Sequence, residues 1–271
     1  MGGITKNKAF MEHSITLGSL PTHYTEYGSG TAVLILHGWG SSASTWKDVQ
    51  EYFSSHGYRA IALDLPGFGK SAEPPREWGL AEYTDFIRSF VDQEKIGRFV
   101  LVGHSFGGRI AIDYAARYGE GVVALILCAS AGIIRSRSLK RSIFALIARV
   151  GSMVTSISFL GSVKAFARKA MYVVVGERDY YNASPVMKEV MRRVLETPLA
   201  HLLPRISQPT LLAWGDADEA TPLSHARMAH QLLPDSTLAI FEGRGHSLQR
   251  EIPQDLAGRI IQFLTEKNIQ P

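Results

Sequence analysis

The hexapeptide Gly103-His104-Ser105-Phe106-Gly107-Gly108 decides the fold, because it stands between a strand pattern and a helix pattern. The apolar run 99–102 precedes it, and apolar residues at helical spacing follow it over 106–117. A serine at such a strand–turn–helix junction is typical of a nucleophile elbow. Small residues on either side of the serine let neighbouring segments approach the sharp turn. The hexapeptide therefore predicts that Ser105 is a nucleophile, and that the N–H of Phe106 at the helix start faces a developing oxyanion.

Working outward from this turn, short apolar runs alternate with helical patterns. The strand candidates, most of them continuous apolar runs typical of strands buried on both faces, are Ala32–Leu36, Arg59–Leu63, Phe99–Gly103, Val122–Cys128, Thr210–Trp214 and Thr237–Phe241. The helical stretches include Ala81–Glu94, Phe106–Arg117, Ser224–Leu233 and Gln254–Glu266. The region Ser14–Tyr27 adds a pair of antiparallel edge strands. This alternation predicts an α/β fold with a mostly parallel sheet of about eight strands and helices on both faces.

The alternation stops between residues 132 and 207. In that stretch one apolar helix face is formed by Leu139, Ile143, Leu146, Ile147, Val150, Met153 and Val154. We therefore expect a helical cap over 132–207, inserted after the sixth strand into a core made of residues 1–131 and 208–271. From Gly132 to Ala200 there are twelve Lys and Arg against four Asp and Glu, a charge of +8, whereas the rest of the chain, with 17 against 21, carries −4. This uneven charge also indicates a separate unit.

A second motif, His37-Gly38-Trp39-Gly40, ends the strand Ala32–Leu36. Its position predicts that the backbone N–H of Trp39 is the second oxyanion donor, paired with that of Phe106. The glycines are also explained by an ordinary strand-ending turn. His37 is expected to organise this loop by hydrogen bonding.

Two further motifs follow the last two predicted strands. An acid is needed to hold a catalytic imidazole in one tautomer, and GDADEATP at 215–222 offers Asp216 and Asp218. We favour Asp218 from its offset after the strand. In GRGHS at 243–247, His246 lies on a glycine-flanked loop and completes the chain order Ser, Asp, His. The predicted triad is Ser105, Asp218 and His246.

These motifs, together with Asp64-Leu65-Pro66-Gly67-Phe68-Gly69-Lys70-Ser71, resemble the α/β-hydrolase fold superfamily over nearly the whole chain. The resemblance is close to the capped small-molecule hydrolases, which include carboxylesterases, carbon–carbon bond hydrolases and cofactor-free perhydrolases. It implies the fold, the triad and the oxyanion hole, but it does not identify the substrate. Haloalkane dehalogenases and epoxide hydrolases carry Asp at the nucleophile position, so Ser105 argues against both.

The resulting hypothesis is a serine hydrolase that cleaves a carboxylic ester of a small, largely apolar substrate through an acyl-enzyme. The candidate pocket residues are His37, Trp39, His104 and Phe106. A carbon–carbon bond hydrolase or a perhydrolase of the same fold is the alternative among enzymes. A ligand receptor that retains the triad is the alternative from another class, and turnover would separate it from an enzyme.

Composition and motif content also bear on the location of the protein and on its possible cofactors and partners. The 271 residues contain one cysteine and lack a recognisable secretory signal at the start, so we expect a reducing compartment, the cytoplasm. The longest apolar-rich stretch, 143–160, is interrupted by Arg149, Gly151 and serines, which argues against a transmembrane segment. No HExxH or paired Cys/His spacing is present, so no metal is expected, and acyl transfer through the predicted triad needs no cofactor. No nucleic-acid-binding module is visible, and the basic cap is either a solvated helix face or a dock for an acidic carrier or an anionic surface.

Overall fold

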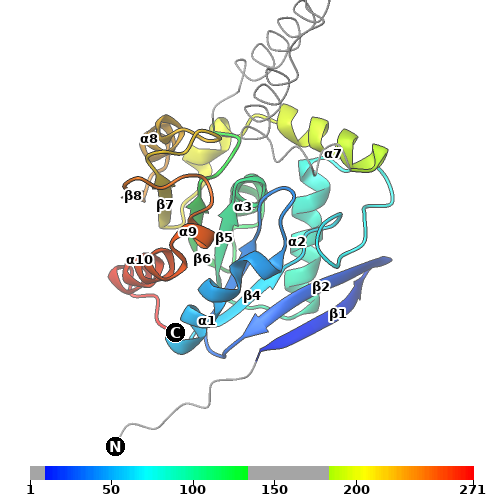
Figure 1. The fold of residues 1–271 in the computed structure, drawn as a ribbon, viewed down its shortest axis with the longest axis horizontal. Coiled ribbons are helices and arrows are strands. Elements are labelled where there is room, and N and C mark those ends of the chain that lie inside the picture. The colour runs from blue at the N-terminus through cyan, green and yellow to red at the C-terminus, as the bar shows by residue number, and fades with distance from the viewer. Residues whose placement is uncertain (1–9, 134–182) are drawn as a thin grey trace, which may run out of the picture.

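The apolar runs form a central β-sheet in the computed structural model, which describes residues 10–133 and 183–271 (Figure 1). Within these residues the sheet has eight strands in the order β1-β2-β4-β3-β5-β6-β7-β8. They are β1 (Met11–Leu17), β2 (Leu20–Tyr27), β3 (Ala32–Leu36), β4 (Arg59–Leu63), β5 (Phe99–His104), β6 (Val122–Cys128), β7 (Thr210–Gly215) and β8 (Ser236–Phe241). Strands β3 to β8 are parallel, whereas β1 and β2 are antiparallel to their neighbours. The predicted mostly parallel sheet of about eight strands is confirmed.

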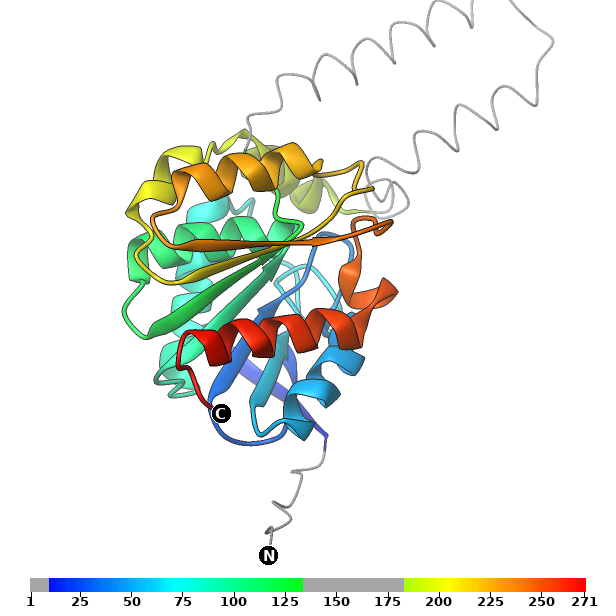
Figure 2. The same cartoon turned by 90° about the vertical axis from the view of Figure 1, so that its left-hand side faces the viewer.

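Helices cover both faces of the sheet, as strands that are apolar on both sides require. One layer contains α1 (Lys47–Ser55), α9 (Leu248–Glu251) and α10 (Pro253–Glu266), and the other contains α2 (Leu80–Gln93), α3 (Phe106–Tyr118), α7 (Pro185–Glu196) and α8 (Leu223–Leu232). Successive residues of β3 alternate between the layers, since Val33 and Ile35 pack in the first and Leu34 and Leu36 in the second. Figure 2 shows the sheet lying between these layers.

The strand order reverses between β3 and β5, and this reversal positions the site. From β3 the chain passes to β4 on one side, and then returns through α2 to β5 on the other side of β3. The loops after β3 and β5 therefore diverge from adjacent strand ends, which are paired from Ala32–Phe99 to Leu36–Gly103. In open α/β sheets, ligands bind in the crevice at such a switch point.

Most of the predicted cap lies outside the described residues. This applies to 134–182, including the apolar face that begins at Leu139 and the basic residues beside it. The described part that follows packs on the core: Val190 in α7, and Leu199 and Leu203 at the short helix η2 (Ala200–Arg205), are completely buried. A hydrogen bond of 3.3 Å from the N–H of Leu199 to the carbonyl of Gly132 joins the two sides of the predicted insertion.

The buried Arg109 of α3 fastens the end of α7 to the core. Its guanidinium donates hydrogen bonds to the carbonyls of Val194 and Thr197. Burial lowers the pKa of Arg109 to about 10, which leaves the group charged at neutral pH. Removing it would leave the Thr197 carbonyl without this donor, at about 1–3 kcal/mol for a buried unsatisfied group, while the Val194 carbonyl would still accept from the N–H of Thr197.

Candidate active site

Ser105 occupies a strained turn between β5 and α3. Its φ of 50° and ψ of −108° lie where L-residues are rarely found, at a cost of about 1–3 kcal/mol. The turn is tight because two glycines allow it: a Cβ at Gly103 would lie 2.6 Å from the Gly107 carbonyl oxygen, and one at Gly107 would lie 2.2 Å from that of Leu36. The side chain of Ser105 stays partly exposed while its neighbours are buried. This is the geometry that a nucleophile elbow requires.

The loop after β3 lies directly against this turn. The N–H of Gly107 donates to the His37 carbonyl at 3.1 Å, which connects the start of α3 to the end of β3. Among residues 10–133 and 183–271, no hydrogen-bond acceptor meets the backbone N–H of Trp39 or of Phe106. These are the two N–H groups predicted as oxyanion donors, and the described residues do not use their hydrogens to stabilise the fold.

The two ring nitrogens of His37 connect the Gly38–Trp39 segment to the loop after β4. Nδ1 is 2.7 Å from the carbonyl oxygen of Gly38, and Nε2 accepts from the N–H of Leu65 at 3.0 Å. Since a carbonyl can only accept, the proton is assigned to Nδ1 and the ring is neutral. Burial lowers the pKa of His37 to about 4, although the Gly38 carbonyl and Asp64 act in the opposite direction.

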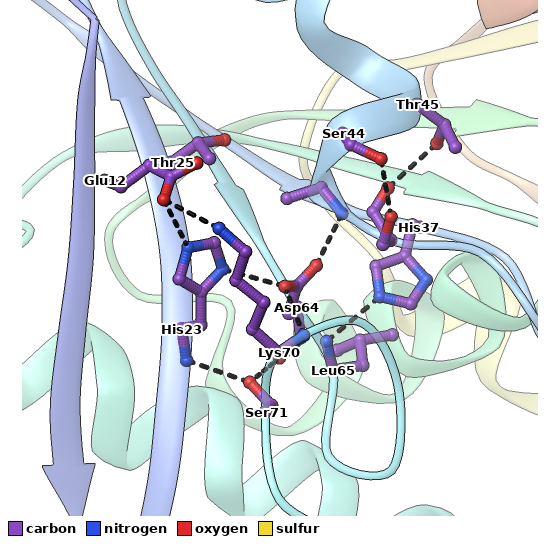
Figure 3. A network of polar contacts seen from close by, with 12 residues as sticks. Glu12, His23, Thr25, His37, Ser44, Thr45, Asp64, Leu65, Lys70 and Ser71 are labelled. Atoms are coloured by element: carbon purple, nitrogen blue, oxygen red, sulfur yellow. Dashed lines mark hydrogen bonds and ion pairs between the residues drawn. The ribbon is translucent and has the colours of Figure 1, made fainter.

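A buried carboxylate, Asp64, stands behind this loop (Figure 3). One oxygen accepts from the N–H of Ala43 at 2.6 Å, and the other accepts from the N–H of Lys70 at 2.9 Å and lies 2.8 Å from Nδ1 of His23. Its backbone carbonyl accepts from the Ser71 hydroxyl at 2.6 Å. Asp64 thus fastens the loop after β3 and the loop after β4 to strand β2.

Asp218 and His246 form the acid–imidazole pair. Asp218 Oδ2 is 2.9 Å from His246 Nδ1; the side chain of the aspartate is 0% exposed and that of the histidine 27%. Burial alone would raise the pKa of Asp218, but hydrogen bonds from His246 and from Thr221 outweigh it and hold that pKa below its ordinary value. The carboxylate accepts a hydrogen bond from Nδ1–H of the imidazole, which leaves Nε2 as the ring nitrogen that can act as a base. The other candidate acid, Asp216, is exposed and accepts from the N–H of Gly243 at 2.7 Å.

Thr221 supports the acid, and the sequence interpretation overlooked it. Its N–H donates to Asp218 Oδ1 at 2.8 Å, and its hydroxyl is 2.7 Å from Oδ2. The N–H of Ala220 also donates to Oδ1 at 2.8 Å. An aspartate that accepts from the N–H groups two and three residues later is an Asx turn, so the Asp-x-x-Thr spacing was an available signal.

In the described residues, His246 is hydrogen-bonded to His104 and not to Ser105. In the described part of the chain the Ser105 hydroxyl has no hydrogen-bond partner, and catalytic hydrogen bonds are often long before substrate binds. Nε2 of His104, the residue before Ser105, is 2.9 Å from the backbone carbonyl oxygen of His246. The side chains of His37 and His104 are both buried, so they support the site from within.

Aromatic rings lie next to the predicted oxyanion donors. The ring centroid of Trp39 is 4.8 Å from that of Phe68 and 5.4 Å from that of Phe106. Trp39 and Phe68 are partly exposed, whereas Phe106 is buried and also packs on Tyr83. Phe68, from the loop after β4, was not among the predicted pocket residues. Its place in the Asp64–Ser71 motif was the available signal, since that loop follows the strand beside β3.

The two buried histidines make stability depend on pH. In the unfolded chain each takes up a proton near its ordinary pKa of 6.5, whereas burial lowers the folded pKa to about 4 for His37 and about 3 for His104. Unfolding therefore binds protons below pH 6.5, and stability present above that pH is lost on acidification. We expect a decrease of up to about 1.4 kcal/mol per pH unit for each histidine. Urea unfolding between pH 7 and pH 4 measures it; His104→Gln should reduce the slope, and an unchanged slope would contradict the assignment.

The described residues were also compared with the requirements of a metal site and of a membrane-spanning helix. Residues 10–133 and 183–271 contain no group of three or more His, Cys, Asp or Glu side chains placed to hold a metal ion. Within the same residues, no helix combines the length and the apolar composition needed to cross a bilayer.

The chain is similar to known proteins along most of its length. The profile of the alpha/beta hydrolase family matches residues 33–259. A 2-hydroxy-6-oxo-6-(2'-aminophenyl)hexa-2,4-dienoic acid hydrolase from Metapseudomonas resinovorans is 27% identical, with 96% of this chain and 92% of that protein covered. A non-heme chloroperoxidase from Streptomyces lividans is 28% identical over 89% of this chain and 95% of its own. The crystal structure of a bacterial membrane phospholipase A has a TM-score of 0.76 and 27% identity, covering 96% of this chain and 87% of that one.

Proposed function

This chain belongs to the alpha/beta hydrolase family and is a hydrolase, and we propose that it cleaves a carboxylic ester through Ser105, His246 and Asp218. The observation that carries the proposal is the Asp218–His246 pair, 2.9 Å apart, whose histidine is bonded through its backbone to the residue next to the strained Ser105. Each of these residues is in a position that suits its proposed role.

In the proposed first half-reaction, Nε2 of His246 removes the proton from the Ser105 hydroxyl as its oxygen attacks the ester carbonyl. The negative charge that develops on the carbonyl oxygen is stabilised by the N–H groups of Trp39 and Phe106. His246 then donates the proton to the departing alcohol, which leaves an acyl-enzyme on Ser105. Asp218 stabilises the imidazolium cation and keeps its ring oriented.

In the second half-reaction, water takes the place of the alcohol. His246 removes a proton from the water as its oxygen attacks the acyl carbonyl, and returns the proton to Ser105 as the carboxylic acid leaves. These steps use only residues of this chain and water. The partly exposed Trp39 and Phe68 support an apolar acyl or alcohol group, because pockets for small molecules are lined mostly by apolar and aromatic side chains.

Carbon–carbon bond hydrolysis is the second candidate. It is favoured by the Metapseudomonas resinovorans relative, whose name describes hydrolysis of a 2-hydroxy-6-oxo-dienoic acid. The same triad would serve a diketone-like substrate, with water cleaving the bond beside the ketone. The chloroperoxidase relative keeps perhydrolysis among the alternatives. A receptor with a retained triad would bind its ligand and release hardly any product.

Two further proposals concern the partner of the basic stretch 132–200 and the location of the chain. The charge of +8 on this stretch suits an acidic carrier or an anionic surface. The single cysteine, Cys128, is buried and free, which suits the cytoplasm.

The experiment is turnover by the purified chain on a matched panel of p-nitrophenyl esters of increasing acyl length, lactones and vinylogous diketones. We expect multiple turnovers on the esters, with kcat/KM rising from acetyl toward medium acyl chains. A preference for the diketones would instead favour carbon–carbon bond hydrolysis as the function. A single product equivalent on every substrate would contradict an enzyme and favour the receptor.

A further inference from the structure

We propose that His104 is a positioning residue that holds the His246 loop against the nucleophile, by donating a hydrogen bond from Nε2 to the backbone carbonyl of His246. The inference deepens the proposed function and rests on it for its kinetic readout. The sequence interpretation treated His104 only as a candidate pocket residue.

The hydrogen bond joins two segments that are far apart in the chain. His104 ends β5 and is 4% exposed, and its Nε2 lies 2.9 Å from the carbonyl oxygen of a residue 142 positions later. The two imidazole rings are 4.9 Å apart between centroids and tilted by 47°. Because the carbonyl can only accept, Nε2 of His104 must carry the hydrogen.

The opposite edge of the His104 ring faces Gly38, in the loop after β3. Nδ1 is buried without a hydrogen-bond partner in the described part of the chain, and a Cβ placed on Gly38 would lie only 2.8 Å from it. A second proton on the ring would therefore be buried without an acceptor. Burial, reinforced by the charge that His246 can carry, lowers the pKa of His104 to about 3. The ring therefore stays neutral and packs between Gly38 and the loop that carries His246.

In the described residues, other bonds hold the backbone of the residues beside His246, whereas Asp218 holds the His246 side chain. The carboxylate of Glu251 accepts from the N–H of Gly245 at 3.0 Å and from that of Ser247 at 3.2 Å. The carbonyl of Arg244 accepts from the N–H of Ala217 at 3.0 Å. The flanking residues are thus fixed independently, and His104 supplies the bond to the carbonyl of His246.

The bond matters because His246 has to serve two partners during the reaction. Its Nδ1 stays on Asp218 while its Nε2 carries a proton between Ser105 and the leaving group. A displacement of about 1 Å in such an arrangement can cost about 10²-fold in rate. A donor located one residue from Ser105 links the position of the base directly to that of the nucleophile.

The test compares His104→Gln with His104→Met, two unbranched side chains of equal length. Gln places an amide NH₂ the same number of bonds from Cα as Nε2 of histidine, whereas Met has no donor. We expect His104→Met to lower kcat/KM for a p-nitrophenyl ester and the rate of fluorophosphonate labelling by about 10–100-fold, mainly through kcat. His104→Gln should stay within about threefold of the original chain. Equal losses in the two variants would overturn the proposal.

Two readouts do not depend on catalysis. Hydrogen exchange of segment 243–248 should be faster in His104→Met than in His104→Gln, while exchange of α8 stays the same; identical exchange in 243–248 would overturn the proposal. In the unmutated chain, nitrogen NMR should show His104 as the neutral Nε2–H tautomer from pH 8 to pH 5, and an Nδ1–H tautomer would overturn the proposal because Nε2 could not donate. Absence of labelling and turnover in the unmutated chain would contradict the proposed function instead, and these two readouts would still decide the role of His104.

Discussion

Replacing Ser105 with alanine is expected to lower ester hydrolysis by a factor on the order of 10⁶, the scale of such losses in serine proteases. The acyl-enzyme cannot form without the hydroxyl, and no other group at the elbow can take its place. Residual activity would come from the N–H groups of Trp39 and Phe106 acting on a bound substrate. The fold should be retained, since the Ser105 hydroxyl has no hydrogen-bond partner among residues 10–133 and 183–271 and alanine also has a Cβ.

Covalent labelling by a fluorophosphonate measures this directly, with kcat/KM for a p-nitrophenyl ester as the second readout. Ser130→Ala is the matched control, because this buried serine lies beside Gly108 in the same region and, within the described residues, its hydroxyl bonds only to the backbone carbonyl of Ala131. We expect the control to label like the unmutated chain and Ser105→Ala not to label. Labelling of Ser105→Ala at the full rate would exclude Ser105 as the nucleophile.

The core strands were predictable because their hydrophobic pattern is simple. Residues Ala32–Leu36, Arg59–Leu63 and Val122–Cys128 were predicted with the same bounds as the observed β3, β4 and β6. Strands that are covered on both faces need apolar residues at every position, and continuous Val, Ile and Leu runs are readily distinguished from the helices between them. The elbow was equally accessible, since its glycines and its strand–helix context are local features.

Elements stabilised by buried polar side chains were harder to predict. Helix α1 was not among the predicted helices, because its buried face consists of Val49, Gln50, Phe53 and Ser54 and only half of it is apolar. The amide of Gln50 makes this possible by donating to the carbonyls of Thr25 and Ala60 at 3.1 Å each. A polar residue satisfied by distant backbone gives no apolar periodicity in its own segment.

The site was predictable as motifs but not as a network. Each motif carries its own local signal, whereas the contacts of Asp64 with His23 and of His104 with His246 join residues 41 and 142 positions apart. Such contacts depend on which strands are neighbours, and motif spacing does not determine strand order. These contacts were missed for this reason, while the residues proposed for the chemistry remain predictions made from local motifs.

Replacing Asp218 with asparagine is expected to lower kcat by about 10⁴-fold, the loss that the corresponding substitution causes in a serine protease. Oδ1 of the asparagine can still accept from the N–H groups of Ala220 and Thr221, so the turn should persist. The amide nitrogen, however, would face Nδ1 of His246 in place of Oδ2. It would donate to that nitrogen, which places the ring proton on Nε2, where it prevents removal of the Ser105 proton.

Asp216→Asn is the matched control, two residues away in the same loop. Asp216 is exposed, and its Oδ1 accepts from the N–H of Gly243, a bond that the oxygen of asparagine can also accept. We therefore expect this variant to stay within about threefold of the unmutated chain, because exposed substitutions of this kind change free energies by only about 0.5 kcal/mol. Steady-state kinetics on the same ester gives the ranking, and thermal unfolding confirms that both variants are folded. Equal losses would contradict the assignment of the acid to Asp218, and a larger loss in Asp216→Asn would assign it to Asp216 despite the contact of 2.9 Å between Asp218 and His246.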